Sequence, residues 1–195
     1  MSLRLVNLVG TRAVRGDEHA QLLGWYADHV HQLLAFDGLH AAALHRLDKG
    51  DAAAPPYLCL YDFTDRAAFD AYERSDVHAQ AAQDRLRGWG RDGIDIVVRA
   101  QFERLYWSAA GNAPESVRCR VHAIRAARSA ATERALAALV IGRATPRHAL
   151  LRAVSTPSPV AEYLVIEHAP VAEASLPGFK IAWQGDYERL HHWWR

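Results

Sequence analysis

The sequence feature that most constrains the fold is an internal repeat. Three segments of the first half recur in the second half in the same order. The matched pairs are 102–107 with 187–193, 57–62 with 163–168 and, more weakly, 3–6 with 117–120. Chance similarity does not preserve order, so the pattern favours duplication of one structural unit. A linker at 108–115, containing glycine, asparagine and proline, separates a first unit at 1–107 from a second at 117–195.

Each unit has the pattern of a β-α-β-β-α-β motif. In the first, residues 3–11, 39–47, 57–63 and 94–107 read as strands, with helices at 17–36 and from Asp65 to about Leu86. The predicted break in this second helix is near 75–76. In the second unit, the strands are 117–125, 147–154, 162–169 and 180–193, and one helix follows Ser129. The second helix of this unit is reduced to a short segment at 171–176.

The predicted fold class is therefore α+β, with two ferredoxin-like halves forming an α+β barrel pseudo-dimer. A four-stranded sheet of this kind covers one face with helices and needs a partner for the other. We expect the two sheets to pack face to face about a pseudo-two-fold axis, with helices outside. The last strands, 94–107 and 180–193, should lie at equivalent seams. The surface uncovered by the missing helix could serve a homodimer.

Composition excludes several classes of partner. The formal net charge is +1, which gives no reason to expect nucleic acid or an anionic membrane. No apolar run approaches the ~20 residues that span a bilayer. Asn7 interrupts the first apolar stretch, which reads as a strand rather than a signal peptide. Cys59 and Cys119 lie in strand-like runs, so we expect reduced buried thiols and a cytoplasmic protein.

Neither the glycine-rich motif nor the histidine pattern predicts a cofactor or a metal. Residues 88–93 fit G-x-G-x-x-G, but a helix precedes them and a strand follows, the reverse of a dinucleotide site. The histidines lack metal-ligand spacing. His29 and His31 are about 200° apart around a helix. His40 and His45, an odd number apart on one strand, should face opposite ways.

His29 is the most informative single residue. On a helical wheel it falls in the apolar arc beside Trp25, Tyr26 and Phe36, whereas His31 faces solvent. Burial would bring its pKa near or below neutrality, a range useful for proton transfer. The competing interpretation is a core histidine bonded to one backbone group. The sequence leaves both open.

Polar-tipped residues on the third strand of each unit are the other candidates. Tyr57 and Tyr61 share one strand face, and their counterparts Tyr163 and Glu167 share the matching face. If the intervening leucines pack on the helices, these four look into the space between the sheets, where Arg99 could join them. A solvated or interfacial face is the alternative.

The first hundred residues resemble the dimeric α+β barrel superfamily, and most of all its EthD-type branch. The resemblance rests on Trp25 and His29, the turn at 36–39, and the strand 57–63. It continues through the following residues Asp65, Phe69, Tyr72, Ser75 and His78. It implies a fused version of proteins that otherwise pair between chains. It further implies either a cofactor-independent enzyme acting on a small apolar or aromatic compound, or an accessory protein of a catabolic or biosynthetic operon. A tandem pair is also similar to haem-binding chlorite dismutase relatives, but no residue matches their haem ligand.

Two hypotheses follow. In the first, a small aromatic molecule binds between the first helix and the sheet. Its candidate catalytic residues are His29, Tyr57 and Tyr61, and its candidate ligand-binding residues are Trp25, Tyr26, Arg99, Tyr163 and Glu167. In the second, the protein is a non-catalytic binding protein with a filled interior or a flat apolar surface carrying Trp193 and Trp194. Neither requires a cofactor or a metal.

Overall fold

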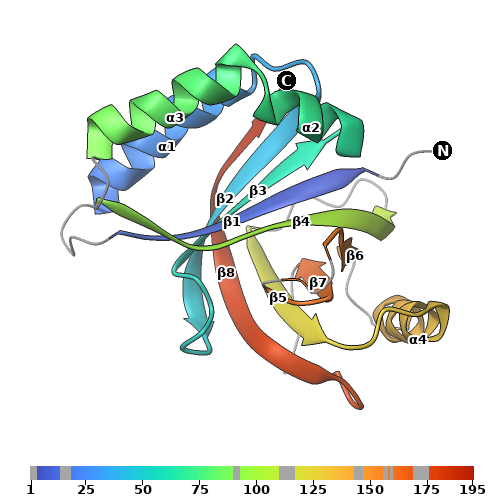
Figure 1. The fold of residues 1–195 in the computed structure, drawn as a ribbon. Helices are drawn as coiled ribbons and strands as arrows, with labels where there is room; N and C mark the ends of the chain where they lie inside the picture. The colour runs from blue at the N-terminus through green and yellow to red at the C-terminus, as the bar shows by residue number, and fades with distance from the viewer. Residues whose placement is uncertain are drawn as a thin grey trace.

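The structure is a computed structural model that describes residues 4–13, 19–89, 93–109, 117–142, 147–155, 158, 160–168 and 176–195. Eight strands and four helices follow one another along this chain (Figure 1). Their order is β1 (Leu5–Ala13), α1 (His19–Leu33), β2 (Leu39–Gly50), β3 (Tyr57–Phe63), α2 (Arg66–Glu73), α3 (Asp76–Trp89), β4 (Ile94–Ala109), β5 (Arg118–Arg125), α4 (Ala130–Ile141), β6 (Arg147–Ala153), β7 (Tyr163–His168) and β8 (Lys180–Trp194).

The eight strands form one closed barrel. Its order is β1-β3-β2-β8-β5-β7-β6-β4, and all neighbouring strands are antiparallel. The strands of the first unit thus lie as β4-β1-β3-β2, and those of the second as β8-β5-β7-β6. The predicted α+β barrel is confirmed, and so is the place of the last strands at the two seams, β4·β6 and β2·β8. The two sheets were expected to pack only face to face. In the structure they also join edge to edge, so the barrel has no open strand edge.

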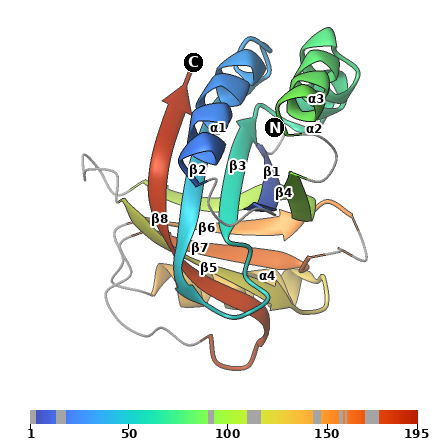
Figure 2. The ribbon, with the colours of Figure 1, turned by 90° about the vertical axis from the view of Figure 1, so that its left-hand side faces the viewer.

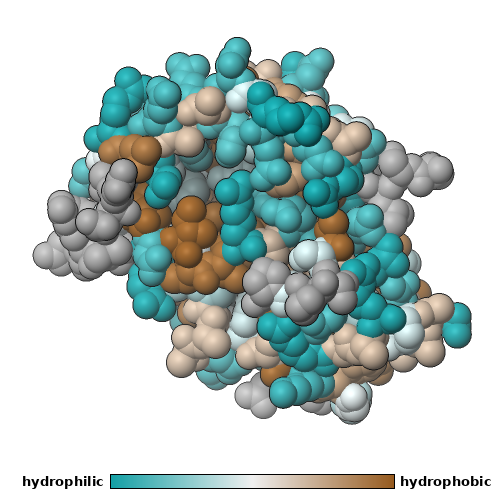
Figure 3. All heavy atoms as spheres, in the orientation of Figure 1, coloured by the Kyte–Doolittle hydropathy of each residue, from teal (hydrophilic) through white to brown (hydrophobic). Residues whose placement is uncertain are grey.

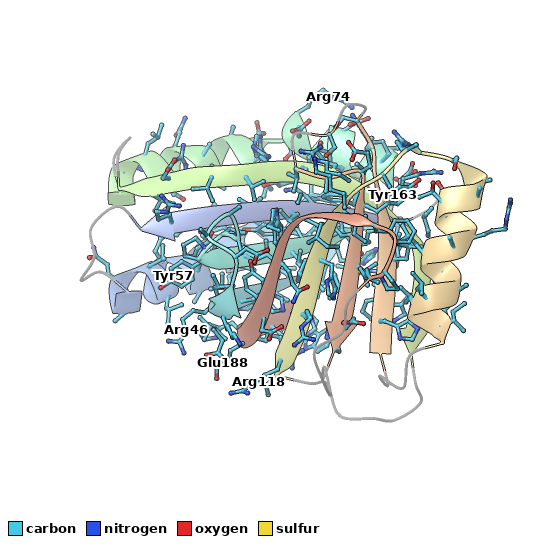
Figure 4. The ribbon with its side chains drawn as sticks, turned by 90° about the horizontal axis from the view of Figure 1, so that it is seen from below. Arg46, Tyr57, Arg74, Arg118, Tyr163 and Glu188 are labelled. Atoms are coloured by element: carbon cyan, nitrogen blue, oxygen red, sulfur yellow. The ribbon has the colours of Figure 1, made fainter. Side chains whose placement is uncertain are left out.

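Side chains alternate between the barrel interior and the outer surface, which helices cover. Inner residues such as Leu58, Phe102 and Val121 belong to one apolar cluster. Outside, α1, α2 and α3 cover the sheet of the first unit, and α4 covers that of the second (Figures 1 and 2). At the β2·β8 seam, Arg46 and Glu188 form an ion pair of 2.8 Å that is visible in Figure 4.

The helix boundaries follow local capping. Asp65 accepts a hydrogen bond from the Ala68 amide at 2.9 Å and begins α2. Ser75 accepts one from the His78 amide at 3.2 Å and begins α3, so the predicted break near 75–76 is confirmed. Ser129 caps α4 through the Thr132 amide at 3.1 Å. Residues 171–175, the greater part of the predicted short segment, lie outside the described residues.

The loop between β2 and β3 closes one end of the barrel. Ala54 and Pro55 are buried there, and the Tyr187 hydroxyl donates to the Pro55 carbonyl at 3.1 Å. A Cβ atom at Gly10 would lie 2.7 Å from the Pro55 Cβ atom, so this approach requires glycine. None of the helices in the described part of the chain has the length and apolar character needed to cross a membrane.

Candidate functional site

A cleft of about 160 Å³ lies between the helix pair α1–α3 and the outer face of β1, β3 and β4. We call it the helix–sheet cleft. Figure 3 shows the surface hollowed beside the helices, with apolar side chains gathered over the strands just below. Its lining is Asn7, Val9, Thr11, Trp25, Tyr26, His29, Leu33, Tyr61, Phe63, Tyr72, His78, Ala81, Ala82, Arg85, Ile94, Ile96 and Arg99.

The floor of the cleft carries hydroxyl and amide groups on an otherwise apolar sheet. Tyr26 of α1 and Thr11 of β1 are buried, and their hydroxyl oxygens are 3.0 Å apart. Asn7 is buried beside them and accepts a hydrogen bond of 3.4 Å from the Gln101 amide. Burial raises the pKa of Tyr26 and Tyr61 well above the ordinary value for a phenol. Both side chains therefore stay neutral and can donate hydrogen bonds.

His29 lines the cleft from α1. Its ring stacks on Trp25, with centroids 4.5 Å apart and planes inclined by 22°. Its Nδ1 atom is buried and has no hydrogen-bond partner among the described residues. Burial, reinforced by the positive charge of Arg85, lowers the pKa of His29 to about 4. The imidazole is therefore neutral near pH 7 and has one nitrogen able to accept a proton.

Aromatic rings form the wall opposite α1. Tyr72 of α2 lies 5.2 Å from the ring of Phe63 and 5.0 Å from that of His78, measured between centroids. Burial raises the pKa of Tyr72 to about 12. Arg99 is half-exposed at the rim, 3.9 Å from the Glu73 carboxylate. The cleft thus has an aromatic wall, neutral hydrogen-bonding groups and cations at its rim.

The structure gathers five of the eight predicted site residues in this cleft and separates the rest. Trp25, Tyr26, His29, Tyr61 and Arg99 all line it. The remaining three, Tyr57, Tyr163 and Glu167, lie outside the cleft.

The condition on which these strand faces depended, that the leucines pack on the helices, is not met. Leu58, Leu60, Leu164 and Ile166 pack inside the barrel, so the residues between them face outward to the helices. Tyr57 lies at the start of β3, whereas Tyr163 is fully buried on the α4 side (Figure 4). The large side chains at odd-numbered positions of β3 and β7, such as Tyr61 and Tyr163, pack into the cores under the helices, and the leucines therefore face the barrel interior.

Glu167 has a structural partner in place of a ligand. Its Oε2 atom lies 3.1 Å from Nε2 of His122, and both side chains are almost completely buried on the outer face of the second sheet. A buried carboxylate needs such a partner, because an isolated charge there is costly.

Sequence reasoning missed Asn7, Thr11 and Arg85, and it marked Tyr72 and His78 only through the family resemblance. The available signal was the pair of polar residues at positions 7 and 11 of an apolar strand, four apart and so on one face. Arg85 lies on α3, and neither its residue type nor its spacing singles it out.

The donor groups and the volume of the cleft bear on metal and haem binding. Among the residues that the structure describes, no group of three or more His, Cys, Asp or Glu side chains could hold a metal ion. At about 160 Å³, the helix–sheet cleft has roughly half of the ~300 Å³ at which pockets for drug-sized ligands begin. A haem does not fit it, whereas ~150 Å³ suffices for a benzene ring.

The chain is thus a mixed α+β protein with an eight-stranded barrel and a cleft under its helices. No protein family profile and no curated protein matches the sequence. Solved structures do match the fold. A candidate monooxygenase from Fusobacterium nucleatum has a TM-score of 0.62 at 9% identity, over 100% of this chain and 95% of its own.

Two further structures agree with the first. An anthrone oxidase-like protein has a TM-score of 0.62 at 11% identity, over 98% of this chain and 92% of its own. A candidate chlorite dismutase has a TM-score of 0.60 at 10% identity, over 97% and 96%. These structures are of the dimeric α+β barrel type, and the likeness establishes that fold for this chain.

Proposed function

We propose that the protein binds a one-ring aromatic compound in the helix–sheet cleft and transfers a proton through His29 without a cofactor, as an enzyme of the EthD-like type. The observation that carries the proposal is the state of His29. Its ring is partly buried against Trp25, its buried Nδ1 atom has no hydrogen-bond partner among the described residues, and it lines a cleft of one-ring size.

The chemistry that suits this arrangement is removal of a proton from a phenol or from an acidified C–H bond. The proton passes to the neutral imidazole of His29, and the electron pair stays on the ligand as a conjugated anion. A histidine placed in this way typically contributes ~10²–10⁴-fold to the rate. Although the pKa of His29 is low in the free protein, the ligand anion beside it would favour the imidazolium form.

Neighbouring residues would orient the ligand and stabilise its charge. Tyr61 is a neutral donor within the lining, and the Tyr26–Thr11 pair supplies a second polar point on the floor. Arg85 and Arg99 line the cleft and favour an anion over a neutral ligand. Trp25 and Tyr72 provide aromatic surface for the ring.

Duplication is part of the same proposal. The units 1–107 and 117–195 share one strand order, and β4 and β8 take equivalent places in it, which supports descent from one repeated unit. In the second unit, the corresponding outer face is filled by Tyr163 and the His122–Glu167 pair. One ligand site per chain follows from this. The buried free thiols of Cys59 and Cys119 favour the cytoplasm, and the dimeric barrel type of the similar structures is compatible with a homodimer.

A non-catalytic binding or accessory role is the second candidate, and the small volume of the cleft favours it. Its two structural predictions have weak support. Trp193 is packed into the core under α1, although Trp194 is exposed, and the barrel interior contains a cavity of about 400 Å³.

A ligand screen with variants tests the proposal. Phenol, catechol and 4-nitrophenol should raise the melting temperature, whereas cyclohexanol should do so less, because ligands of the native state stabilise it. His29→Gln should keep ring binding but lose the conversion of bound 4-nitrophenol to phenolate, read by absorbance. His31→Gln is the matched control, since His31 is exposed on the same helix. Binding of 4-nitrophenol without phenolate formation in the wild type would favour the accessory role. If none of the phenols binds, both the enzymatic and the accessory role in this cleft are refuted.

A further inference from the structure

A second cavity, of about 400 Å³, occupies the barrel interior at the end opposite the β2–β3 loop. We call it the barrel-end cavity. It lies on the other side of the same strands as the helix–sheet cleft. On β3, for example, Leu60 and Asp62 face inward to the barrel-end cavity, whereas Tyr61 faces outward to the cleft.

The deep part of the cavity is apolar and exists because several inward residues are small. Ala41, Ala43 and Ala149 occupy positions where larger side chains would fill the space. Around them lie the aliphatic side chains of Val6, Leu60, Leu151 and Ile166. An apolar body in this region would be removed from water, which is the main favourable contribution to binding.

The mouth of the cavity is basic. Arg4, Arg104 and Arg189 line it, and among the described side chains of the lining one is a carboxylate, that of Asp62. Arg195 lines it too, but its guanidinium is paired with Asp37. Four histidines complete the polar lining, namely His40, His45, His168 and His192. Burial lowers the pKa of His45 to about 3, so this ring is neutral and adds no positive charge to that of the arginines.

Arg104 is held in place at this mouth. Its Nη2 atom lies 3.0 Å from Asp62, whose other oxygen is 2.8 Å from Arg4. Its guanidinium lies 4.7 Å above the ring of Trp107. Its Nε atom is buried with no hydrogen-bond partner among the described residues. A buried N–H without a partner is costly, and an anionic group at the mouth would reduce that cost.

We propose that the barrel-end cavity binds an amphiphilic carboxylate, with its apolar body among the inner alanine and aliphatic residues and its anionic head at Arg104 and Arg189. The volume exceeds by more than twofold the ~150 Å³ that holds a benzene ring, so a medium-length chain or a two-ring body fits. A monoanion suits the mouth better than a dianion, because Asp62 already neutralises part of the arginine charge. This site is independent of the proton transfer proposed for His29.

Calorimetry with octanoate, octanol and acetate tests the proposal on the whole chain. Octanoate should bind at least about tenfold more tightly than octanol, because charge-assisted hydrogen bonds to arginine add to the apolar contribution. Acetate, which lacks the apolar body, should bind at least as weakly as octanol. Arg104→Gln and Arg189→Gln should each weaken octanoate about tenfold and leave octanol unchanged. Arg87→Gln, an equal loss of charge on the exposed face of α3, is the control and should change neither.

A filled cavity provides the second test. Ala43→Leu should abolish binding of both octanoate and octanol, while circular dichroism shows that the protein stays folded. If Ala43→Leu does not fold, Ala149→Val is used in its place. Equal affinity for octanoate and octanol, undiminished binding in a folded filled variant, or no effect of either arginine substitution would overturn the proposal. Loss of octanoate binding in His29→Gln would also overturn the proposal, because it would show that octanoate binds in the helix–sheet cleft.

Discussion

His29 stacks on Trp25 at 4.5 Å between ring centroids, on one turn of α1 and facing the helix–sheet cleft. The two residues are four apart, which places them on the same side of the helix. The contact fixes the plane of the imidazole, and its burial leaves the ring neutral.

Stability should decrease in acid because of two histidines, the partly buried His29 and the buried His45. The pKa of His29 is about 4 and that of His45 about 3 in the folded protein, both below the ordinary value of 6.5. Between that value and the folded pKa, the unfolded chain binds more protons. The free energy of unfolding therefore falls as pH falls through this window, by up to about 1.4 kcal/mol per pH unit for each residue.

Urea denaturation at pH 7, 6, 5 and 4 measures this effect. His29→Gln should flatten the dependence between pH 6 and 4, and His31→Gln, on the exposed side of the same helix, should not. The groups near His29 are Arg85, Asp84 and His78. An unchanged slope in His29→Gln would mean that His29 is not buried in the neutral form.

The Thr11–Tyr26 pair should behave as a buried hydrogen bond. Tyr26→Phe leaves the Thr11 hydroxyl buried without its 3.0 Å partner, which should cost about 1–3 kcal/mol. A double-mutant cycle with Thr11→Val should give a coupling energy of at least about 0.5 kcal/mol in urea denaturation. Strictly additive losses would show that the two hydroxyls do not interact.

Asp65 should stabilise the fold by capping α2. Asp65→Ala removes the acceptor of the Ala68 amide and should lower the free energy of unfolding by about 1 kcal/mol. Asp70→Ala in the same helix removes only a surface ion pair with Arg66 and should cost about 0.5 kcal/mol or less. Equal losses in the two variants would contradict the capping role.

Glu167 should be needed for stability and not for binding in the cleft. Glu167→Leu leaves His122 buried without its 3.1 Å partner and should cost about 3 kcal/mol or more, whereas Glu167→Gln keeps a hydrogen bond and should cost less. Thermal unfolding and 4-nitrophenol titration of both variants separate the two roles. A changed affinity for 4-nitrophenol in a Glu167→Gln protein that remains stable would contradict this separation of roles. It would support the contact between Glu167 and the ligand that the sequence predicted.

Much of the fold could be predicted from the sequence, because strand and helix periodicities and the order of the repeats are local signals. The break at Ser75 and the caps at Asp65 and Ser129 are of this kind. His29 in an apolar, aromatic arc was also readable, since a helical wheel depends only on spacing.

The faces of the strands could not be predicted by counting, because bulges change their parity. His40 and His45 were expected on opposite faces of one strand, yet both line the barrel-end cavity, since the register of β2 shifts between Leu39 and Ala41. A similar shift opposite Gly10 turns Ile96 toward the cleft while Phe102 faces inward.

Proton transfer to His29 on ligand binding is the central claim, and the ¹⁵N resonances of its imidazole test it most directly. In the free protein at pH 7, the two ring nitrogens should show the separate shifts of a neutral imidazole. Saturating 4-nitrophenol should bring them together at the position of the imidazolium, while the resonances of exposed His31 stay unchanged. A His29 ring that remains neutral in the complex, or a ligand that does not perturb it, would contradict the account.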